Sequence, residues 1–287
     1  MFYLFLFVVL DAFGVSFSKY FFNLGVHPYF FVFLSGLTAA LLLLTYLLIK
    51  KISLLKIFNK QTIKSALPTS IFISLASLFG FLSLKYISPT NYALLFRTNL
   101  LFIPWLSKII LKEKASWLLY PLGLVVLTGV WLLNNDWTLY FNVSGYSLAL
   151  LAALMSAFDF IYQKKATINI NKDVVAFWRR LISAIAVGSI WLLTPQLGFS
   201  NKYFIKIMLF GIGLFLISLA LIRALVSQKV AKVNLYSNIT VMLIALISYF
   251  AFNERLTSIQ ILGGGLIMGA IIVYNIYGRY DLRNNSG

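Results

Sequence analysis

Two aspartates and four arginines lie inside segments of the sequence that are otherwise apolar. They are Asp11, Arg97, Asp159, Arg179, Arg180 and Arg223. Charged groups are expensive in hydrocarbon, so those that persist there bind a ligand, move a proton or pair with one another. A guanidinium group suits a carboxylate or phosphate, whereas a carboxylate suits an ammonium group or a proton.

The two aspartates lie on polar stripes that repeat along the chain. Asp11, Gly14 and Ser18 are spaced i, i+3, i+7 and so share one face of a helix. The pattern returns 145 positions later over residues 156–163, around Asp159. Two such stripes would face one another across a central cavity, with Asp11 or Asp159 as proton acceptor or as ligand for an ammonium group. The alternative is a closed, buried ion pair with Arg97 or with an arginine at 179.

The arginines are the second set of candidates. Arg97 lies seven residues into its segment, which is roughly 10 Å along a helix. Asn238 occupies the matching position 141 residues later. We predict that both line a substrate site or gate, the alternative for Arg97 being a structural ion pair. Arg179 and Arg180 point about 100° apart on a helix, so at most one faces a cavity, and the other reaches lipid phosphate.

Hydroxyl, amide and aromatic side chains complete the predicted site. Ser77 and Asn234 could line a cavity, and Tyr92, Trp105 and Trp178 could stack on a ligand. Helix packing is the alternative for the first two, and contact with lipid for the aromatics. The predicted substrate-binding or gating residues are Asp11, Ser18, Ser77, Tyr92, Arg97, Trp105, Asp159, Trp178, Arg179, Asn234 and Asn238.

The sequence does not favour an enzyme. It contains no cysteine, and His27 is its single histidine, which excludes thiolate chemistry and a histidine cluster for a metal. The motifs HExxH, GxSxG and the P-loop are absent from it. We therefore expect neither a cofactor nor a metal.

Composition identifies the elements that position these residues. Of 287 residues, 61% are apolar and 11% charged, against roughly 25% charged in soluble domains. Ten apolar segments have about the length that crosses a bilayer. They cover residues 2–22, 28–49, 66–87, 90–111, 116–133, 144–163, 174–194, 204–225, 233–252 and 258–278. The sequence therefore predicts an all-α membrane protein with ten transmembrane helices, the first being a mature helix and not a cleaved leader.

The charge of the chain indicates its orientation. Lysine and arginine number 24 against 7 aspartates and glutamates, giving a net charge of +17. With the N-terminus inside, 15 basic residues fall on the inner side and 5 on the outer side. This bias predicts cytoplasmic N- and C-termini in the cytoplasmic (inner) membrane. Lysines between the second and third segments are expected to rest on anionic lipid, so the bilayer, and not nucleic acid, accounts for the charge.

The two halves of the sequence match. The stretch KEKAS at residues 112–116 corresponds to NERLT at 253–257, and Gly123 to Gly264, both at an offset of 141. Each half holds five predicted helices, so the second enters the membrane inverted. We predict a first five-helix repeat at 1–133 and a second at 144–278. Gly265-xxx-Gly269 predicts a close helix contact, with the fifth helix or in a homodimer.

These features resemble the drug/metabolite transporter superfamily, EamA type. The stretches from Tyr86 to Ser116 and from Lys232 to Tyr274 are similar to its two signatures. The resemblance implies alternating access around a cavity lined by helices one to four and six to nine. It does not specify the substrate, and Ser35 stands where relatives often have a basic residue.

Together these observations predict a secondary transporter of a small polar metabolite. Arginines outnumber aspartates within the helices, which favours a substrate with a carboxylate or phosphate. Because the aspartates suit an ammonium group, an amino acid or related carboxylate is the best-matched class. Phosphorylated or nucleotide-linked anions and, third, multidrug or cation export remain the alternatives.

Overall fold

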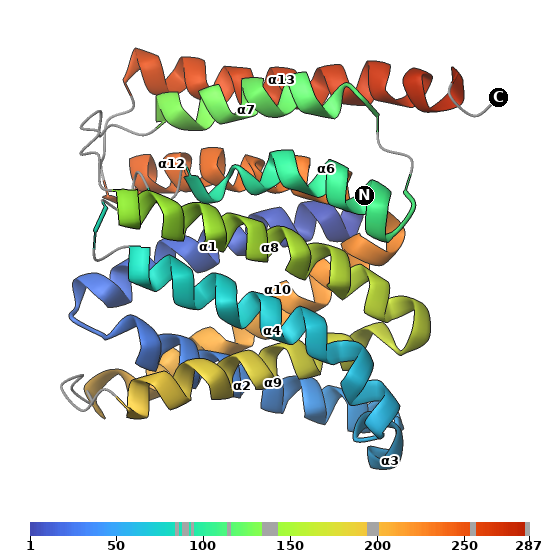
Figure 1. The fold of residues 1–287 in the computed structure, drawn as a ribbon. Helices are drawn as coiled ribbons and strands as arrows, with labels where there is room; N and C mark the ends of the chain where they lie inside the picture. Colours follow the sequence, from blue (N-terminus) through green and yellow to red (C-terminus); the bar gives the residue numbers. More distant parts are fainter. Residues whose placement is uncertain are drawn as a thin grey trace. The chain divides into compact units, whose positions relative to one another are not determined.

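The structure is a computed structural model, and it describes residues 1–83, 86–87, 92, 95–113, 116–133, 143–193, 201–252 and 257–284. Its elements are helical (Figure 1). They are α1 (Phe2–Asn23), α2 (Pro28–Ile49), α3 (Leu54–Ile57), α4 (Lys60–Ser83), α6 (Asn99–Ile110), α7 (Leu119–Leu133), α8 (Val143–Asn169), α9 (Lys172–Leu192), η1 (Asn201–Tyr203), α10 (Phe204–Ser227), α11 (Val230–Ser237), α12 (Ile239–Phe252) and α13 (Ser258–Asn284).

The all-helical membrane class is confirmed. Among the described residues, six helical stretches are long and apolar enough to cross a bilayer, and four shorter apolar ones lie at residues 2–18, 99–110, 119–132 and 230–244. Each of the ten predicted segments overlaps one of these ten stretches. The fourth predicted segment, 90–111, falls partly outside the described residues. The short helix α3, between the second and third predicted segments, was not predicted.

The ninth predicted segment is not one continuous helix. It breaks at Asn238 into α11 and α12, because the Asn238 side chain competes with the backbone for helix carbonyls. Its Nδ2 donates to the carbonyl of Asn234 at 3.0 Å. A turn at Arg97 and Thr98 precedes α6 in the same way, with the Thr98 hydroxyl donating to the carbonyl of Leu95 at 2.6 Å. The predicted positions 97 and 238 thus both lie at helix breaks.

The chain divides into two compact units. Unit 1 comprises residues 1–77 and 162–227, and unit 2 comprises residues 78–161 and 228–287. Each unit draws on both halves of the sequence, and α4 and α8 each run from one unit into the other. The predicted repeats at 1–133 and 144–278 are a relationship between two parts of the sequence, and their bounds differ from those of the compact units. The inverted repeat stays a prediction.

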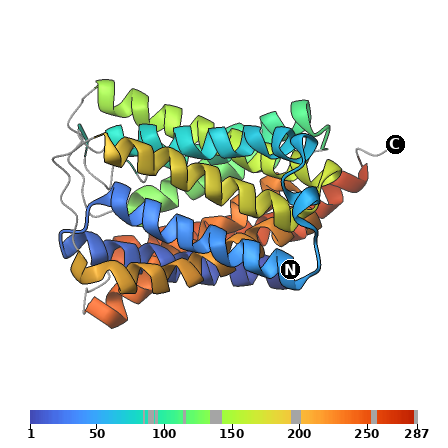
Figure 2. The same cartoon turned by 90° about the horizontal axis from the view of Figure 1, so that it is seen from below.

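Within unit 1, small residues bring helices close together. Neighbouring helices in this unit are α2 with α9, α2 with α10, and α1 with α10 (Figure 2). A Cβ built on Gly36 would lie 3.2 Å from the Cβ of Ala184, and one on Gly14 would lie 3.1 Å from Cδ1 of Ile217. Close approach of this kind is how membrane helices associate without a hydrophobic driving force.

Gly211 in α10 gives the sharpest test of this packing. A Cβ there would lie 2.6 Å from the Cβ of Thr38 and 3.0 Å from the carbonyl oxygen of Ser35. Gly211→Ala should therefore destabilise the protein by about 1–3 kcal/mol, read as a lower melting temperature in detergent. Gly213, two residues along the same helix, has nothing within 4 Å of its Cβ position. Gly213→Ala is the matched control, and equal melting of the two variants would contradict this packing.

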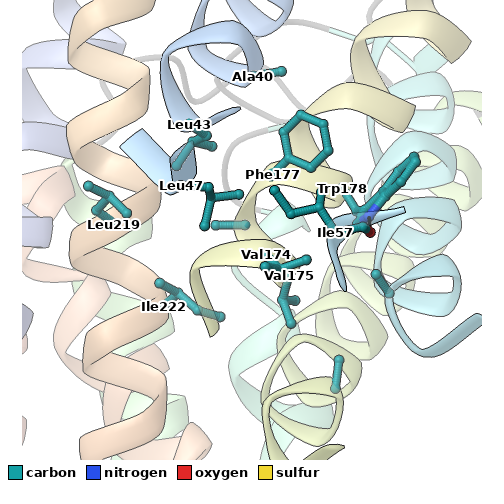
Figure 3. Packing of buried hydrophobic residues seen from close by; sticks show 13 residues of the cluster. Ala40, Leu43, Leu47, Ile57, Val174, Val175, Phe177, Trp178, Leu219 and Ile222 are labelled. Atoms are coloured by element: carbon teal, nitrogen blue, oxygen red, sulfur yellow. Dashed lines mark hydrogen bonds between the residues drawn. The ribbon is translucent and has the colours of Figure 1, made fainter. Parts of the chain in front are cut away.

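The main apolar cluster of unit 1 lies at the end of α2 that leads into α3 (Figure 3). Leu43 and Leu47 from α2 pack with Phe177 from α9 and Ile222 from α10. Trp178 joins this cluster and is 8% exposed. Its indole Nε1 donates to the carbonyl oxygen of Ile57 at 2.9 Å, which fixes α3 against α9.

In unit 2, α7 and α13 lie side by side (Figure 1). Gly129 makes their contact possible, because a Cβ there would lie 2.7 Å from the carbonyl oxygen of Gly263. The predicted contact of this glycine-rich segment with the fifth helix is made through Gly263 and Ile267, and not through Gly265 and Gly269. Nothing described lies within 4 Å of the Cβ position of either, since the face carrying Gly263 and Ile267 meets α7 instead. The dimer alternative stays a prediction.

Candidate functional site: a polar pocket in unit 1

A pocket of about 260 Å³ lies among five helices of unit 1. Its wall combines two charged groups, four serines and apolar side chains. The lining residues are Asp11, Gly14, Val15 and Ser18 of α1, Phe31, Val32, Ser35 and Gly36 of α2, Ile73 and Ser77 of α4, Arg180, Ser183 and Ala184 of α9, and Phe210, Leu214 and Ile217 of α10. Of the predicted site residues, this pocket brings together Asp11, Ser18 and Ser77.

Two opposite charges line this small space. Asp11 comes from the middle of α1 and Arg180 from the middle of α9, and both are partly buried. The Arg180 Nε donates to Oγ of Ser218 at 2.7 Å. Ser218 in turn donates to the carbonyl of Leu214, also at 2.7 Å. This chain of hydrogen bonds anchors the guanidinium to α10 and limits its rotation at the pocket wall.

The serines of the pocket present oxygen atoms as acceptors. The hydroxyl of Ser18 donates to the carbonyl of Val15 at 2.7 Å, and that of Ser77 to the carbonyl of Ile73 at 2.9 Å. Ser35 likewise donates to its own helix, at the carbonyl of Phe31. A hydroxyl whose proton points at its own backbone offers lone pairs to a donor. These oxygens and the Asp11 carboxylate therefore suit an ammonium group.

The structure distinguishes the two neighbouring arginines of α9. Arg180 lines the pocket, whereas Arg179 is 6% exposed and is not one of the lining residues. Spacing alone does not make this choice, because Arg179 also shares a helix face with Ser183, four residues further on. Trp178 also lies away from the pocket, with its N–H bonded to Ile57.

A charged cluster that sequence reasoning missed lies at one end of unit 1. Asp173, in the first turn of α9, is 3.6 Å from Nζ of Lys50 and 3.8 Å from Nη2 of Arg223. Arg223 also donates to the hydroxyl of Tyr46 at 2.7 Å and lies over the ring of Tyr3. A hydrogen bond of the Lys50 side chain itself with Tyr46 is the first cause that raises the pKa of Lys50. This cluster joins α1, α2, α9 and α10.

The other predicted residues belong to unit 2. Asp159 is fully buried, and so are Asn234 on α11 and Asn238 at the break between α11 and α12. Nearby in sequence to Asp159, Ser156 accepts a hydrogen bond from Nδ2 of Asn99 at 3.4 Å. Arg97 lies in the turn before α6 and is partly buried. Whether these residues meet the substrate stays a prediction.

Two aromatic residues of unit 2 differ in their surroundings. Tyr92 packs its ring against that of Phe96 with centroids 5.6 Å apart. Trp105 is 56% exposed on α6, as expected for a side chain that faces lipid. Stacking of either residue on a ligand stays a prediction.

The glutamate of the first repeated motif has a structural partner. Oε2 of Glu113 accepts a hydrogen bond from the backbone N–H of Val230 at 3.1 Å. Val230 is the first residue of α11, so the carboxylate satisfies an N–H at the positive end of that helix. Its counterpart Glu254 lies outside the described residues.

Ten apolar helical stretches in the described part of the chain define the class of a multi-pass membrane protein, and unit 1 holds a polar pocket among its helices. The family model of the EamA-like transporter family matches residues 1–135 and 143–276. The chain belongs to the EamA-like transporter family, whose members are transporters and not enzymes.

The chain is similar to a curated protein and to a solved structure. A Dictyostelium discoideum protein named provisionally as a UDP-sugar transporter is 30% identical over 139 residues, which are 47% of this chain. The match spans 36% of the length of that curated relative. A solved crystal structure has a TM-score of 0.83 at 16% identity, covering 97% of this chain and 98% of that one. That likeness concerns the fold.

Proposed function

We propose that this transporter moves a zwitterionic amino acid, or a closely related small carboxylate, by alternating access. The observation that carries the proposal is one pocket that holds Asp11 and Arg180 together. Arg180 would bind the substrate carboxylate, which a guanidinium matches in geometry and charge. Asp11 and the serine oxygens would bind the ammonium group. Phe31 and Phe210 would contact the apolar part of the side chain.

The size and charge of the pocket favour this substrate class. Its volume of about 260 Å³ lies just below the ~300–1,000 Å³ that is usual for drug-sized ligands. A nucleotide sugar is larger than an amino acid, and its diphosphate carries about two negative charges at neutral pH. One arginine lines the described pocket, and the Asp11 carboxylate would repel such an anion.

The alternative is a nucleotide-linked anion, favoured by the name of the Dictyostelium relative. In that case the substrate would need further cationic groups, for which Arg97 is the sequence-based candidate. Multidrug or cation export is disfavoured because an arginine lines the same pocket as the carboxylate.

The helix breaks fit a transport cycle with moving helices. Turns at Arg97–Thr98 and at Asn238 interrupt the helices, and Arg97 and Asn238 are 141 residues apart. Broken helices supply both hinges and exposed backbone groups in secondary transporters. We further propose, from the lysine bias, that both termini face the cytoplasm and that the protein resides in the cytoplasmic membrane. A homodimer through the open Gly265 face is part of the same proposal.

A ligand screen on the purified protein tests the substrate class. Ligand binding raises the free energy of unfolding by RT ln(1 + [L]/Kd), which is about 2.7 kcal/mol at 100 times Kd. We expect one or more L-amino acids to raise the melting temperature by several degrees. UDP-sugars, sugar phosphates and quaternary amines should leave it unchanged. Stabilisation by UDP-sugars alone would replace the amino acid proposal by its alternative.

A further inference from the structure

A second cavity of unit 1 lies where the α2–α4 connection meets the α8–α9 connection. Its volume is about 500 Å³. Ten residues from these two connections and the adjacent helix ends line it. They are Lys51, Ile52, Ser53, Lys56, Asn59, Thr62, Asn169, Ile170, Asn171 and Val174. The polar pocket around Asp11 shares none of them.

The charge of this cavity is positive. Lys51 and Lys56 line it, and none of its described lining residues is acidic. Asp173 follows Asn171 closely in sequence, but Lys50 and Arg223 flank its carboxylate at 3.6 and 3.8 Å. Those two cations compensate Asp173 and do not line the cavity, so the two lining lysines set its electrostatic character.

The polar wall of the cavity is held in place by local hydrogen bonds. The hydroxyl of Thr62 donates to the carbonyl of Lys56 at 3.0 Å. The side chain of Asn59 accepts from the N–H of Gln61 at 3.0 Å, and that of Asn171 from the N–H of Asp173 at 2.9 Å. The lysines are therefore presented by a folded connection and not by a solvated tail.

Exposed apolar residues flank the same connection. Leu55 is 86% exposed and lies next to Lys56, and Ile168 is 74% exposed and lies next to Asn169. Leu54 and Ile49 are also exposed, the latter at 75%. A soluble surface rarely gathers large apolar side chains around a basic hollow, whereas a membrane interface requires both features together.

We propose that this cavity binds the phosphate headgroup of an anionic phospholipid. Lys51 and Lys56 bind the phosphate, and the amide and hydroxyl groups of Asn59, Thr62 and Asn169 surround the polar headgroup. The acyl chains extend along Leu55 and Ile168. A lipid bound here bridges two connections of unit 1 and stabilises it. This site is independent of the proposed substrate.

The test uses short-chain lipids with the full-length protein in a non-ionic detergent, where no charged bilayer surface is present. Dioctanoyl phosphatidylglycerol, dioctanoyl phosphatidylcholine and inorganic phosphate are each titrated while the melting temperature is followed. We expect phosphatidylglycerol to stabilise the wild type saturably. Phosphatidylcholine and inorganic phosphate should have little effect at the same concentrations.

Charge-matched variants locate the site. K51Q/K56Q removes the two lining lysines, and K60Q/K64Q removes two exposed lysines of α4 that do not line the cavity. We expect phosphatidylglycerol to bind K51Q/K56Q at least about tenfold more weakly and to bind K60Q/K64Q within threefold of wild type. If the double variant does not fold, the single variants K51Q and K56Q take its place. Each should bind phosphatidylglycerol more weakly than K60Q/K64Q does.

Three results would overturn the lipid site. One is an equal loss of affinity in both double variants, which would mean general surface charge. The second is equal stabilisation by phosphatidylcholine. The third is an equal effect of inorganic phosphate, which would mean a phosphate site that ignores the lipid.

Discussion

Replacing Arg180 with alanine is expected to lower kcat/KM for amino acid transport by about 100-fold or more. The variant loses a charge-assisted contact with the substrate carboxylate and leaves that carboxylate uncompensated in a low-dielectric pocket. Breaking such a buried pair costs about 3–5 kcal/mol, and each 1.36 kcal/mol is a factor of ten. Initial rates of labelled amino acid uptake into proteoliposomes, at several concentrations, give the ratio.

Two control variants separate binding from folding. Arg180→Lys keeps the charge but loses the planar fork, so it should retain part of the activity. Ser218→Ala removes the hydrogen bond that Oγ of Ser218 accepts from Arg180 at 2.7 Å and should cost about three- to tenfold through looser positioning. Transport at the wild-type rate by a well-folded Arg180→Ala variant would show that Arg180 does not bind the substrate.

The second large effect is expected at Asp11. Asp11→Asn keeps the size of the side chain and removes its charge, so the ammonium group of the substrate loses its counter-ion. We expect kcat/KM for zwitterionic amino acids to fall by about 100-fold, since charged hydrogen bonds of partly buried groups contribute about 1.5–3 kcal/mol each. Deaminated carboxylic acids of the same size should compete better in this variant than in wild type.

Counterflow distinguishes this role of Asp11 from proton coupling. Exchange of labelled for unlabelled substrate at equal pH on both sides needs binding but no net proton movement. A proton acceptor that does not touch substrate would leave exchange intact in Asp11→Asn while uphill uptake is lost. Loss of both activities supports the ammonium contact, and intact exchange would contradict it.

The helical class was predictable because the bilayer imposes one requirement on each segment. About 20 apolar residues must follow one another, and no tertiary information is needed to see this. The second segment, 28–49, has the same bounds as α2 (Pro28–Ile49). The break at Asn238 was not predicted, because hydropathy does not register a side-chain amide that bonds to its own helix.

The site was predictable only where a single helix face carries the pattern. Asp11 and Ser18 share a face of α1, and both line the pocket. Choosing between Arg179 and Arg180 needed the rotation of α9 against α10, which depends on packing at positions far apart in sequence. The cluster of Asp173, Lys50 and Arg223 was missed for the same reason. It joins three helices, and hydrophobic periodicity does not show how those helices are aligned with one another.

The most direct test of the central claim is counterflow of a labelled neutral L-amino acid in proteoliposomes that hold the wild-type protein. Unlabelled amino acids, UDP-sugars and quaternary amines are compared as competitors at equal concentration. The pocket with Asp11 and Arg180 predicts that label accumulates and that zwitterionic amino acids compete, while the other two classes do not. Absence of amino acid exchange, together with accumulation of a labelled UDP-sugar, would contradict it.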